Sequence, residues 1–167
     1  MIEAATDYLV GLFAGKVPEE LIIFLISMLP VLELRGGMIA AKLLGVSLGK
    51  AFVICYLGNI VPIPFILLFI RRIFALMSKT ATGKKIVDRL MSRSKKHEEK
   101  VLRYRRAGLL LLVAVPLPGT GGWTGALVAA LMDMRMKYSL PIIAAGVLIA
   151  DTLMAIISYG LLGLFIR

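Results

Sequence analysis

The sequence predicts an all-α integral membrane protein made of two inverted repeats, each a re-entrant helical hairpin followed by a transmembrane helix. Three observations support this prediction. Hydrophobic residues make up 59% of the 167 residues, and the mean hydropathy is +0.90, well above that of a soluble domain. A Pro/Gly-rich break occurs twice, as MLPVLELRGG at 28–37 and AVPLPGTGGW at 114–123. The net charge of +10 falls in one segment between the second and third long apolar stretches.

The 167 residues form a single membrane domain, and its first segment, 1–18, predicts a short helix at the membrane interface. Glu3 and Asp7 place negative charge where a signal peptide needs positive charge, so this segment is not a signal peptide. Four apolar side chains share one face of the predicted helix and would lie among the lipid headgroups. They are Tyr8, Leu9, Leu12 and Phe13.

Repeat 1 is expected over 19–70. The twelve uncharged residues of 21–32 give roughly 18 Å of helix, about half of a bilayer. The chain would turn at the break and return over 36–45, which predicts a hairpin whose tip lies near the membrane midplane. Ala51 to Ile70 then gives twenty residues without a charge, enough to span the hydrocarbon core. Pro62 and Pro64 should kink this helix or leave backbone carbonyls free.

The segment 71–106 carries thirteen basic and three acidic residues, and the rest of the chain is neutral. The positive-inside rule therefore places this loop in the cytoplasm. Apolar residues between 86 and 91 form a short stripe, which predicts an amphipathic helix on anionic lipid. For 92–100 a solvated basic linker is the alternative. Nucleic-acid binding is not expected, because no aromatic interleaving or recognition fold accompanies the charge.

Repeat 2 is expected over 107–167. Residues 107–115 lead into the break, 116–122 form it, and 123–132 lead out. One kinked spanning helix over 107–132 is the alternative, but two prolines and three glycines in seven residues favour the hairpin. The final apolar run, 139–166, contains one charged residue, Asp151. With the basic loop in the cytoplasm, the two hairpins enter from opposite faces, so the repeats are inverted, and Arg167 lies on the outer side.

Glu33 and Arg35 are the strongest candidates for a functional site. Ionisable side chains at membrane depth are costly and often functional. In a non-helical tip after Pro30 the two residues can pair or point into one cavity. The alternative is an ion pair that only stabilises the tip.

The paired glycines, Gly36-Gly37 and Gly121-Gly122, stand where each return helix should begin. A helix N-terminus presents unpaired N–H groups and the positive end of the helix dipole, which favour an anion. Thr120 is expected to cap the second helix or to donate to a ligand. Together with Arg35, these groups predict a site for a phosphate or a carboxylate. Close helix packing is the alternative role of the glycines.

Asp151 and Asn59 lie in corresponding helices of the two repeats. Asp151 is interpreted as a proton carrier or as a hydrogen-bonded contact between helices, and Asn59 as structural. Trp123 is expected to serve helix packing, with ligand stacking second. An enzyme is not expected, because the chain has no phosphate-binding loop and a single histidine, His97, in the polar loop. No cofactor or metal site is expected for the same reason.

The motifs PVLELRGG at 30–37, GN at 58–59 and PLPGTGGWTG at 116–125 resemble those of the small multidrug export protein family of prokaryotes, over nearly the whole chain. That family is distantly similar to the DedA (VTT-domain) membrane proteins, which also have two re-entrant hairpins. By this resemblance Glu33 and Arg35 match the first functional tip. At the second tip DedA proteins carry an arginine after the Pro-Gly pair, whereas here Thr120 follows it.

Two functional hypotheses follow from these observations. The first is a secondary transporter or exporter in the plasma membrane, coupled to protons or another ion, for a small amphiphilic or phosphate-bearing lipid-like substrate. The second is a non-transporting scaffold or assembly factor that acts through the basic loop. The expected partners are membrane lipids and the substrate. Homo-oligomerisation is left open, because so short a chain often needs a second copy to enclose a pathway.

Overall fold

The computed structural model describes residues 2–13, 17–77, 79–80, 105–117, 119–132 and 134–161. Within these ranges the chain is helical with short connecting turns, so the predicted all-helical class is confirmed. The elements are α1 (Ile2–Phe13), α2 (Glu19–Met28), α3 (Glu33–Leu43), α4 (Leu48–Ile60), α5 (Pro62–Met77), α8 (Arg105–Ala114), α9 (Gly122–Leu131), α10 (Met136–Ala155) and the π-helix η1 (Ile156–Leu161).

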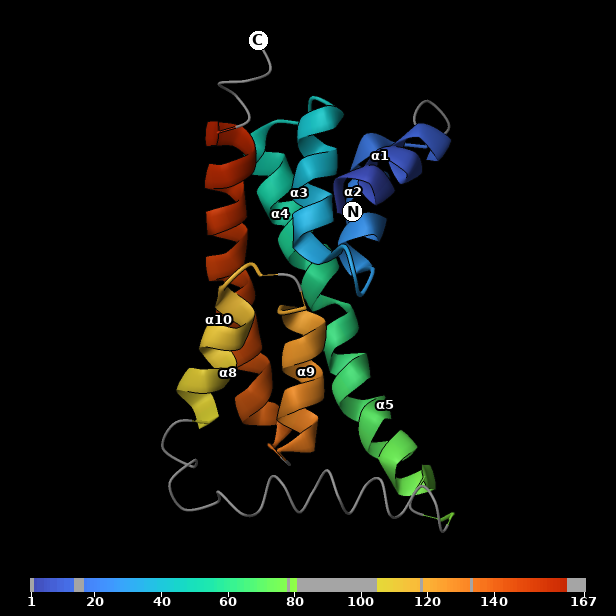
Figure 1. Cartoon of the computed structure of the whole chain (residues 1–167), viewed down its shortest axis with the longest axis vertical. Coiled ribbons are helices and arrows are strands. Elements are labelled where there is room, and N and C mark those ends of the chain that lie inside the picture. Colours follow the sequence, from blue (N-terminus) through green and yellow to red (C-terminus); the bar gives the residue numbers. More distant parts are fainter. Residues whose placement is uncertain are drawn as a thin grey trace.

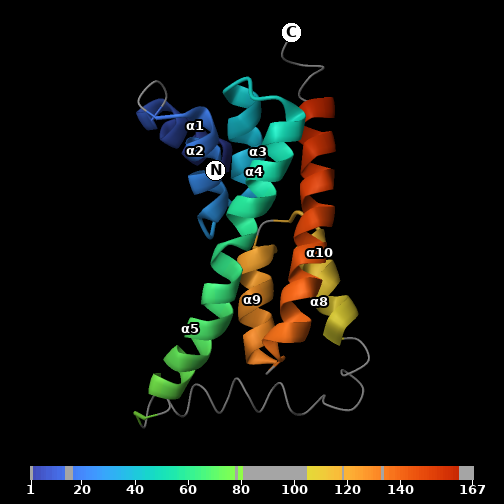
Figure 2. The same cartoon turned by 180° about the vertical axis from the view of Figure 1, so that it is seen from behind.

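The helices are arranged in two halves along the long axis of the molecule. Figure 1 shows α1, α2 and α3 in the upper half and α8 and α9 in the lower half, and the view from behind agrees (Figure 2). The helix pair α4–α5 and the helix α10 with η1 run through both halves. The turn between α2 and α3 and the turn between α8 and α9 meet at mid-height. The two breaks are thereby brought together.

Two helical stretches are long and apolar enough to cross a membrane, Leu48–Phe69 with 22 residues and Met136–Gly160 with 25 residues. They correspond to the predicted spans 51–70 and 139–166, each beginning three residues earlier. The first of these stretches is interrupted at Val61, between α4 and α5, next to the prolines expected to disturb it. Pro62 occupies the first position of α5, where its missing N–H costs no hydrogen bond. Pro141 is accommodated in the second turn of α10.

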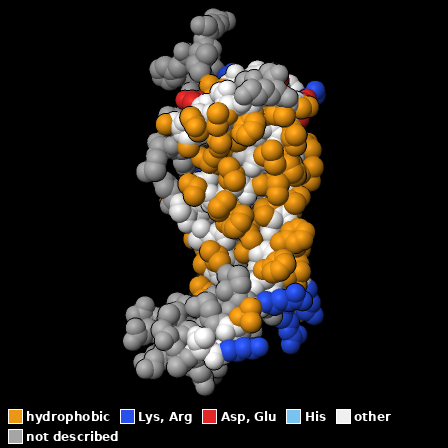
Figure 3. Space-filling view, turned by 90° about the vertical axis from the view of Figure 1, so that its right-hand side faces the viewer, with side chains coloured by type: hydrophobic (Ala, Val, Ile, Leu, Met, Phe, Trp, Pro, Cys, Tyr) orange, Lys and Arg blue, Asp and Glu red, His pale blue; other side chains and the backbone are white. Residues whose placement is uncertain are grey.

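Small side chains fill much of the interior, while many large apolar side chains point outward. Ala40, Ala51, Ala126 and Ala129 are fully buried, although larger residues such as Ile23 also contribute to the core. Many leucines, valines and phenylalanines along the spans are exposed, and Figure 3 shows an apolar band with Lys and Arg gathered at one end. Small residues at helix contacts and large apolar residues outside suit a lipid solvent.

The described residues leave part of the prediction open. The helix α1 agrees with the expected N-terminal helix, and Tyr8, Leu12 and Phe13 are exposed as an interfacial face requires. Most of the basic segment 71–106, including the predicted amphipathic stripe at 86–91, lies outside the described residues, as does Arg167. Re-entrant hairpins, their inversion and the cytoplasmic position of the loop stay predictions.

Candidate functional site

The first break lies between α2 and α3 and holds Glu33 in an unusual backbone conformation. Pro30 cannot donate to a helical hydrogen bond, and α2 ends at Met28. Glu33 has a φ of 48°, a left-handed conformation that costs a residue with a side chain about 1–3 kcal/mol. Its N–H donates to Leu29 O at 2.8 Å, which secures this turn. Such strain is kept where surrounding contacts fix it, and it marks the break as a site candidate.

The second break, between α8 and α9, is organised around Thr120. The Thr120 hydroxyl lies 2.7 Å from Val115 O and 2.8 Å from Leu117 O, and it accepts the Leu117 N–H at 3.1 Å. Thr120 N–H donates to Leu117 O at 3.1 Å. Gly119 and Gly121 have φ values of 83° and 134°, which favour glycine. The break is therefore an ordered loop with its own hydrogen bonds.

The two breaks are joined by three hydrogen-bonding groups. Glu33 Oε1 accepts the backbone N–H of Trp123 at 3.1 Å. Arg35 Nη2 donates to Thr120 O at 2.6 Å and to Thr120 Oγ1 at 3.0 Å. The indole Nε1 of Trp123 donates to Met28 O at 3.1 Å. We call these five residues, Met28, Glu33, Arg35, Thr120 and Trp123, the tip cluster.

Glu33 occupies the N-terminus of α9. Trp123 is the second residue of that helix, so its N–H has no partner within the helix, and the positive end of the helix dipole favours a carboxylate there. Gly121 leaves the necessary room, because a Cβ at this position would overlap the Glu33 carboxyl group. The Glu33 carboxyl group therefore occupies the helix N-terminus at Gly121-Gly122, whereas binding of a substrate anion there stays a prediction.

The structure corrects the predicted start of the first return helix. α3 begins at Glu33 and not at Gly36, so Glu33 and Arg35 lie in its first turn rather than in a non-helical tip. The Gly36 N–H donates to Leu32 O at 2.9 Å and is not available to an anion. Gly37 permits close packing instead, since a Cβ there would overlap Ser27 Oγ and lie 3.0 Å from Cys55 Sγ.

Two further expectations about the breaks change. Thr120 does not cap α9, whose N-cap residue is Gly121; its hydroxyl accepts from Arg35 instead. Trp123 does more than pack, because both its backbone and its indole nitrogen bind the first break. The position of this tryptophan directly after the second break was the signal for that role. The described residues contain no ion pair between Glu33 and Arg35, because each residue binds the opposite break.

Asn59 and Asp151 are buried polar residues outside the tip cluster. Both are 0% exposed, and neither atom of the Asn59 amide nor either Asp151 carboxyl oxygen has a hydrogen-bond partner. The Asn59 amide faces the Glu33 carboxyl without a hydrogen bond of good geometry. Asp151 instead lies near Cys55, close enough for an electrostatic interaction with its thiol. Asp151 therefore makes no hydrogen-bonded contact between helices.

Comparison with known proteins now identifies the family. The profile described as "Putative small multi-drug export protein" matches residues 33–153, from Glu33 past Asp151 and across both breaks. The chain belongs to this family. No curated protein and no solved structure matches the chain. Family membership and the two span-length helices indicate a membrane protein, whereas similarity to DedA proteins stays a prediction.

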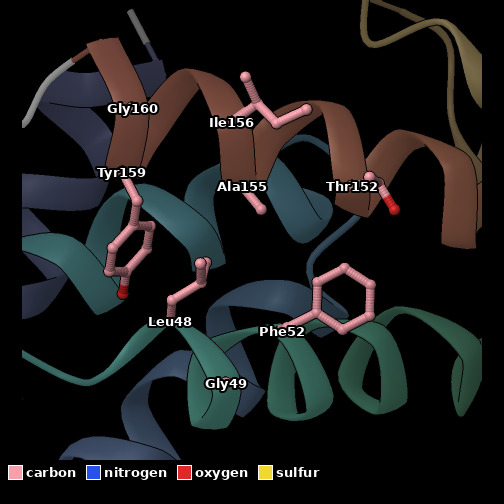
Figure 4. Close-up of a pocket in the computed structure, with 8 residues that line it drawn as sticks. All are labelled: Leu48, Gly49, Phe52, Thr152, Ala155, Ile156, Tyr159 and Gly160. Atoms are coloured by element: carbon pink, nitrogen blue, oxygen red, sulfur yellow. The ribbon is translucent and has the colours of Figure 1, made fainter.

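In this family member a cavity of about 700 Å³ lies between the start of α4 and the end of α10, as Figure 4 shows. Its lining is mostly apolar, with Phe52 and Ile156 on opposite walls. The Thr152 hydroxyl is bonded to Leu148 O at 2.9 Å, and the Tyr159 hydroxyl donates to Val46 O at 2.7 Å. This cavity is not the polar cavity expected beside Glu33 and Arg35, which stays a prediction.

Proposed function

We propose that this protein is a secondary exporter of a small amphiphile bearing a phosphate or carboxylate group, coupled to protons or another ion. The two hairpins are re-entrant in the plasma membrane, the repeats are inverted, and the basic loop 71–106 is cytoplasmic. The substrate's anionic group binds at the N-terminus of α9, beside Arg35 and Thr120. Its apolar part stays in contact with lipid.

The observation that carries this proposal is the position of the Glu33 carboxyl group at the α9 N-terminus. Helix N-termini bind phosphates and carboxylates through free N–H groups and the helix dipole. Glu33, which belongs to the first repeat, already places a carboxylate at this helix N-terminus of the second repeat. Arg35 places a permanent positive charge at the same point, bound to Thr120, and its planar fork suits phosphate or carboxylate.

Exchange of Glu33 and the substrate at the α9 N-terminus couples substrate binding directly to protonation of Glu33. When Glu33 takes a proton, it loses the charge that suits the helix N-terminus and can leave the Trp123 N–H. The substrate anion then replaces it on the same N–H groups and on Arg35. Release of the proton returns Glu33 to α9 and displaces the substrate. Because Glu33 joins the two repeats, this exchange also opens and closes the contact between them, as alternating access requires.

The scaffold hypothesis has one observation in its favour. Glu33 and Arg35 are both hydrogen-bonded to the second break, so the tip cluster also fits a permanent lock between the repeats. In that case the charged groups stabilise the fold, and no substrate replaces them. The two hypotheses differ in what substitutions at these residues do to transport.

The deciding experiment measures movement of a fluorescent lipid phosphate and of a carboxylated amphiphile across proteoliposome membranes with an imposed pH gradient. Arg35→Lys keeps the charge but loses the fork, and should lower the transport rate markedly. Glu33→Gln keeps the shape but cannot release a proton, and should abolish dependence on the pH gradient. Lys50→Gln is the control, because Lys50 is exposed and pairs with Glu20 at 3.4 Å. Wild-type rates in both tip variants would refute the transporter proposal and favour the scaffold.

A further inference from the structure

Two fully buried polar side chains in the middle of the fold lack any partner. Asn59 and Asp151 are 0% exposed, and all four of their side-chain N and O atoms are without a hydrogen bond. A buried amide without a partner costs a few kcal/mol, and an isolated carboxylate costs more. Unsatisfied buried groups of this kind mark a bound water or ion, or a functional role. The Asn59 amide faces the Glu33 carboxyl group of the tip cluster without a hydrogen bond of good geometry, and Asp151 lies outside that cluster.

The two side chains lie on facing sides of α4 and α10. Figure 1 shows that these helices run in opposite directions beside one another. A Cβ at Gly122 would meet both Asn59 Oδ1 and Val147 Cγ2, so Asn59 lies at the level of Val147. Asp151 is one turn beyond Val147, near Cys55, which is one turn before Asn59. The two polar groups are therefore offset by one helical turn, about 6 Å.

Among the side chains that the structure describes, no cation compensates Asp151. Every described Lys or Arg side chain on a helix packed against α10 is engaged elsewhere or exposed. Arg35 binds Thr120, Lys42 lies over the Tyr159 ring, and Arg106 lies over the Tyr138 ring. The remaining described titratable groups on α3, α4, α5, α9 and α10 are of three kinds. Cys55 is buried and lies near Asp151, and Glu33 faces α9. Tyr56 donates to Ala144 O at 3.5 Å, and the others are exposed, namely Lys50, Arg72, Lys137 and Tyr138.

We propose that Asp151 and Asn59 form a binding site for a single monovalent cation, a proton or Na⁺, between α4 and α10. A carboxylate in a low-dielectric interior needs one positive charge, and one carboxylate cannot neutralise a divalent ion. The amide oxygen of Asn59 is a second hard oxygen ligand on the facing helix, of the kind that Na⁺ takes. A proton would need Asp151 alone.

This site goes beyond the exchange of Glu33 with a substrate and does not depend on it. Asn59 has neighbours on both sides, Glu33 towards the second break and Asp151 one turn away. A cation that draws the Asn59 oxygen towards Asp151 changes the surroundings of Glu33. The cation site is therefore placed to influence the tip cluster, where Trp123 is the single tryptophan of the chain.

The test is thermal unfolding of the purified full-length chain in detergent, followed by Trp123 fluorescence. Na⁺ is varied against N-methylglucamine at constant ionic strength, and pH is varied from 5 to 9. A ligand that binds only the folded state raises the midpoint by about 3–5 °C for each tenfold increase above its Kd. Such a rise with Na⁺ identifies sodium, and a rise with falling pH but not with Na⁺ identifies the proton.

Three variants complete the test. Asp151→Asn should lose a sodium response, or should reduce a pH response to the part that Glu33 contributes through Trp123. Asn59→Leu should lose only a sodium response. Thr152→Val is the matched control, because Thr152 is adjacent, exposed and bonded to its own helix, and it should respond as wild type. If Asp151→Asn fails to fold, wild-type Asp151 is labelled with a carbodiimide and the labelling is measured by mass spectrometry. Labelling of Asp151 that falls with added Na⁺ or with rising pH supports the site. Identical Na⁺ and pH responses in wild type and Asp151→Asn, or labelling that neither condition changes, would overturn the proposal.

Discussion

Replacing Gly121 by alanine should cost clearly more stability than replacing Gly119, two residues earlier in the same break. Both glycines have positive φ, 134° and 83°, so alanine adds backbone strain of about 1–3 kcal/mol at either position. The surroundings differ. A Cβ at Gly119 meets nothing within 4 Å, whereas a Cβ at Gly121 would overlap the Glu33 carboxyl group. Gly119→Ala is therefore a control for a positive φ without the clash, although the φ of 134° and ψ of −166° at Gly121 lie in a region that is essentially restricted to glycine.

The additional cost at Gly121 follows from what the new methyl group displaces. Glu33 must move away, and the Trp123 N–H loses the acceptor that now lies at 3.1 Å. A buried N–H left without a partner costs about 1–3 kcal/mol. Gly121→Ala should thus exceed Gly119→Ala by about that amount. In a Glu33→Ala background the clash is absent, and the difference between the two glycine variants should shrink by about that amount, leaving only the difference in backbone strain.

The assay is equilibrium unfolding in mixed detergent micelles with increasing dodecyl sulfate, followed by the fluorescence of Trp123, which itself lies in the tip cluster. Far-ultraviolet circular dichroism checks that local and global unfolding coincide. Equal costs for the two glycine variants would refute the close approach of Glu33 to Gly121. A difference that persists undiminished in the Glu33→Ala background would assign it to backbone strain instead of the carboxyl group.

Two further predictions concern packing and topology. Gly58→Ala should destabilise the protein by about 1–3 kcal/mol, because the new Cβ would lie 2.8 Å from the backbone oxygen of Phe24. Gly49→Ala on the same helix should stabilise the protein by about 0.5–1 kcal/mol, since a Cβ there meets nothing within 4 Å. Thermal unfolding compares the two variants, and equal effects would contradict the tight contact between α2 and α4. Cysteines introduced at Ser47 and Lys79 on a cysteine-free background should be labelled from opposite sides of the membrane, because these exposed residues lie at opposite ends of the spanning helix pair; labelling of both from one side would exclude the proposed topology.

The limits of the second break could be predicted from sequence because they are set by local chemistry. Pro116 and the glycines that follow cannot continue a helix, and the predicted return at 123 differs by one residue from the observed start of α9 at Gly122. The start of α3 could not be predicted in the same way. Glu33 adopts a left-handed conformation and is held by Trp123, a partner far along the chain. A prediction from local sequence preferences alone therefore places the start of α3 at Gly36, three residues after the observed start at Glu33.

Glu33 and Arg35 were identified from the cost of placing ionisable groups at membrane depth, and the repeat correctly placed them close to 120–122. The identity of their partners was not predictable, because both residues bind the opposite break rather than each other. The sequence favours a structural role for Asn59. Its isolation, and that of Asp151, depends on how α4 and α10 pack, which composition does not determine. Binding roles for these residues stay predictions.

The hydrogen bonds between the two breaks connect residues 85 to 95 positions apart in the chain, and this separation has a consequence for synthesis. As the ribosome extends the chain, Glu33 and Arg35 emerge long before Thr120 and Trp123 exist. In the proposed re-entrant topology both breaks lie at membrane depth, where ionisable side chains without partners are poorly tolerated. On that proposal the first hairpin cannot settle at its final depth alone. It must wait beside water or the insertion machinery until the second half arrives. Insertion of the second hairpin thus completes the first.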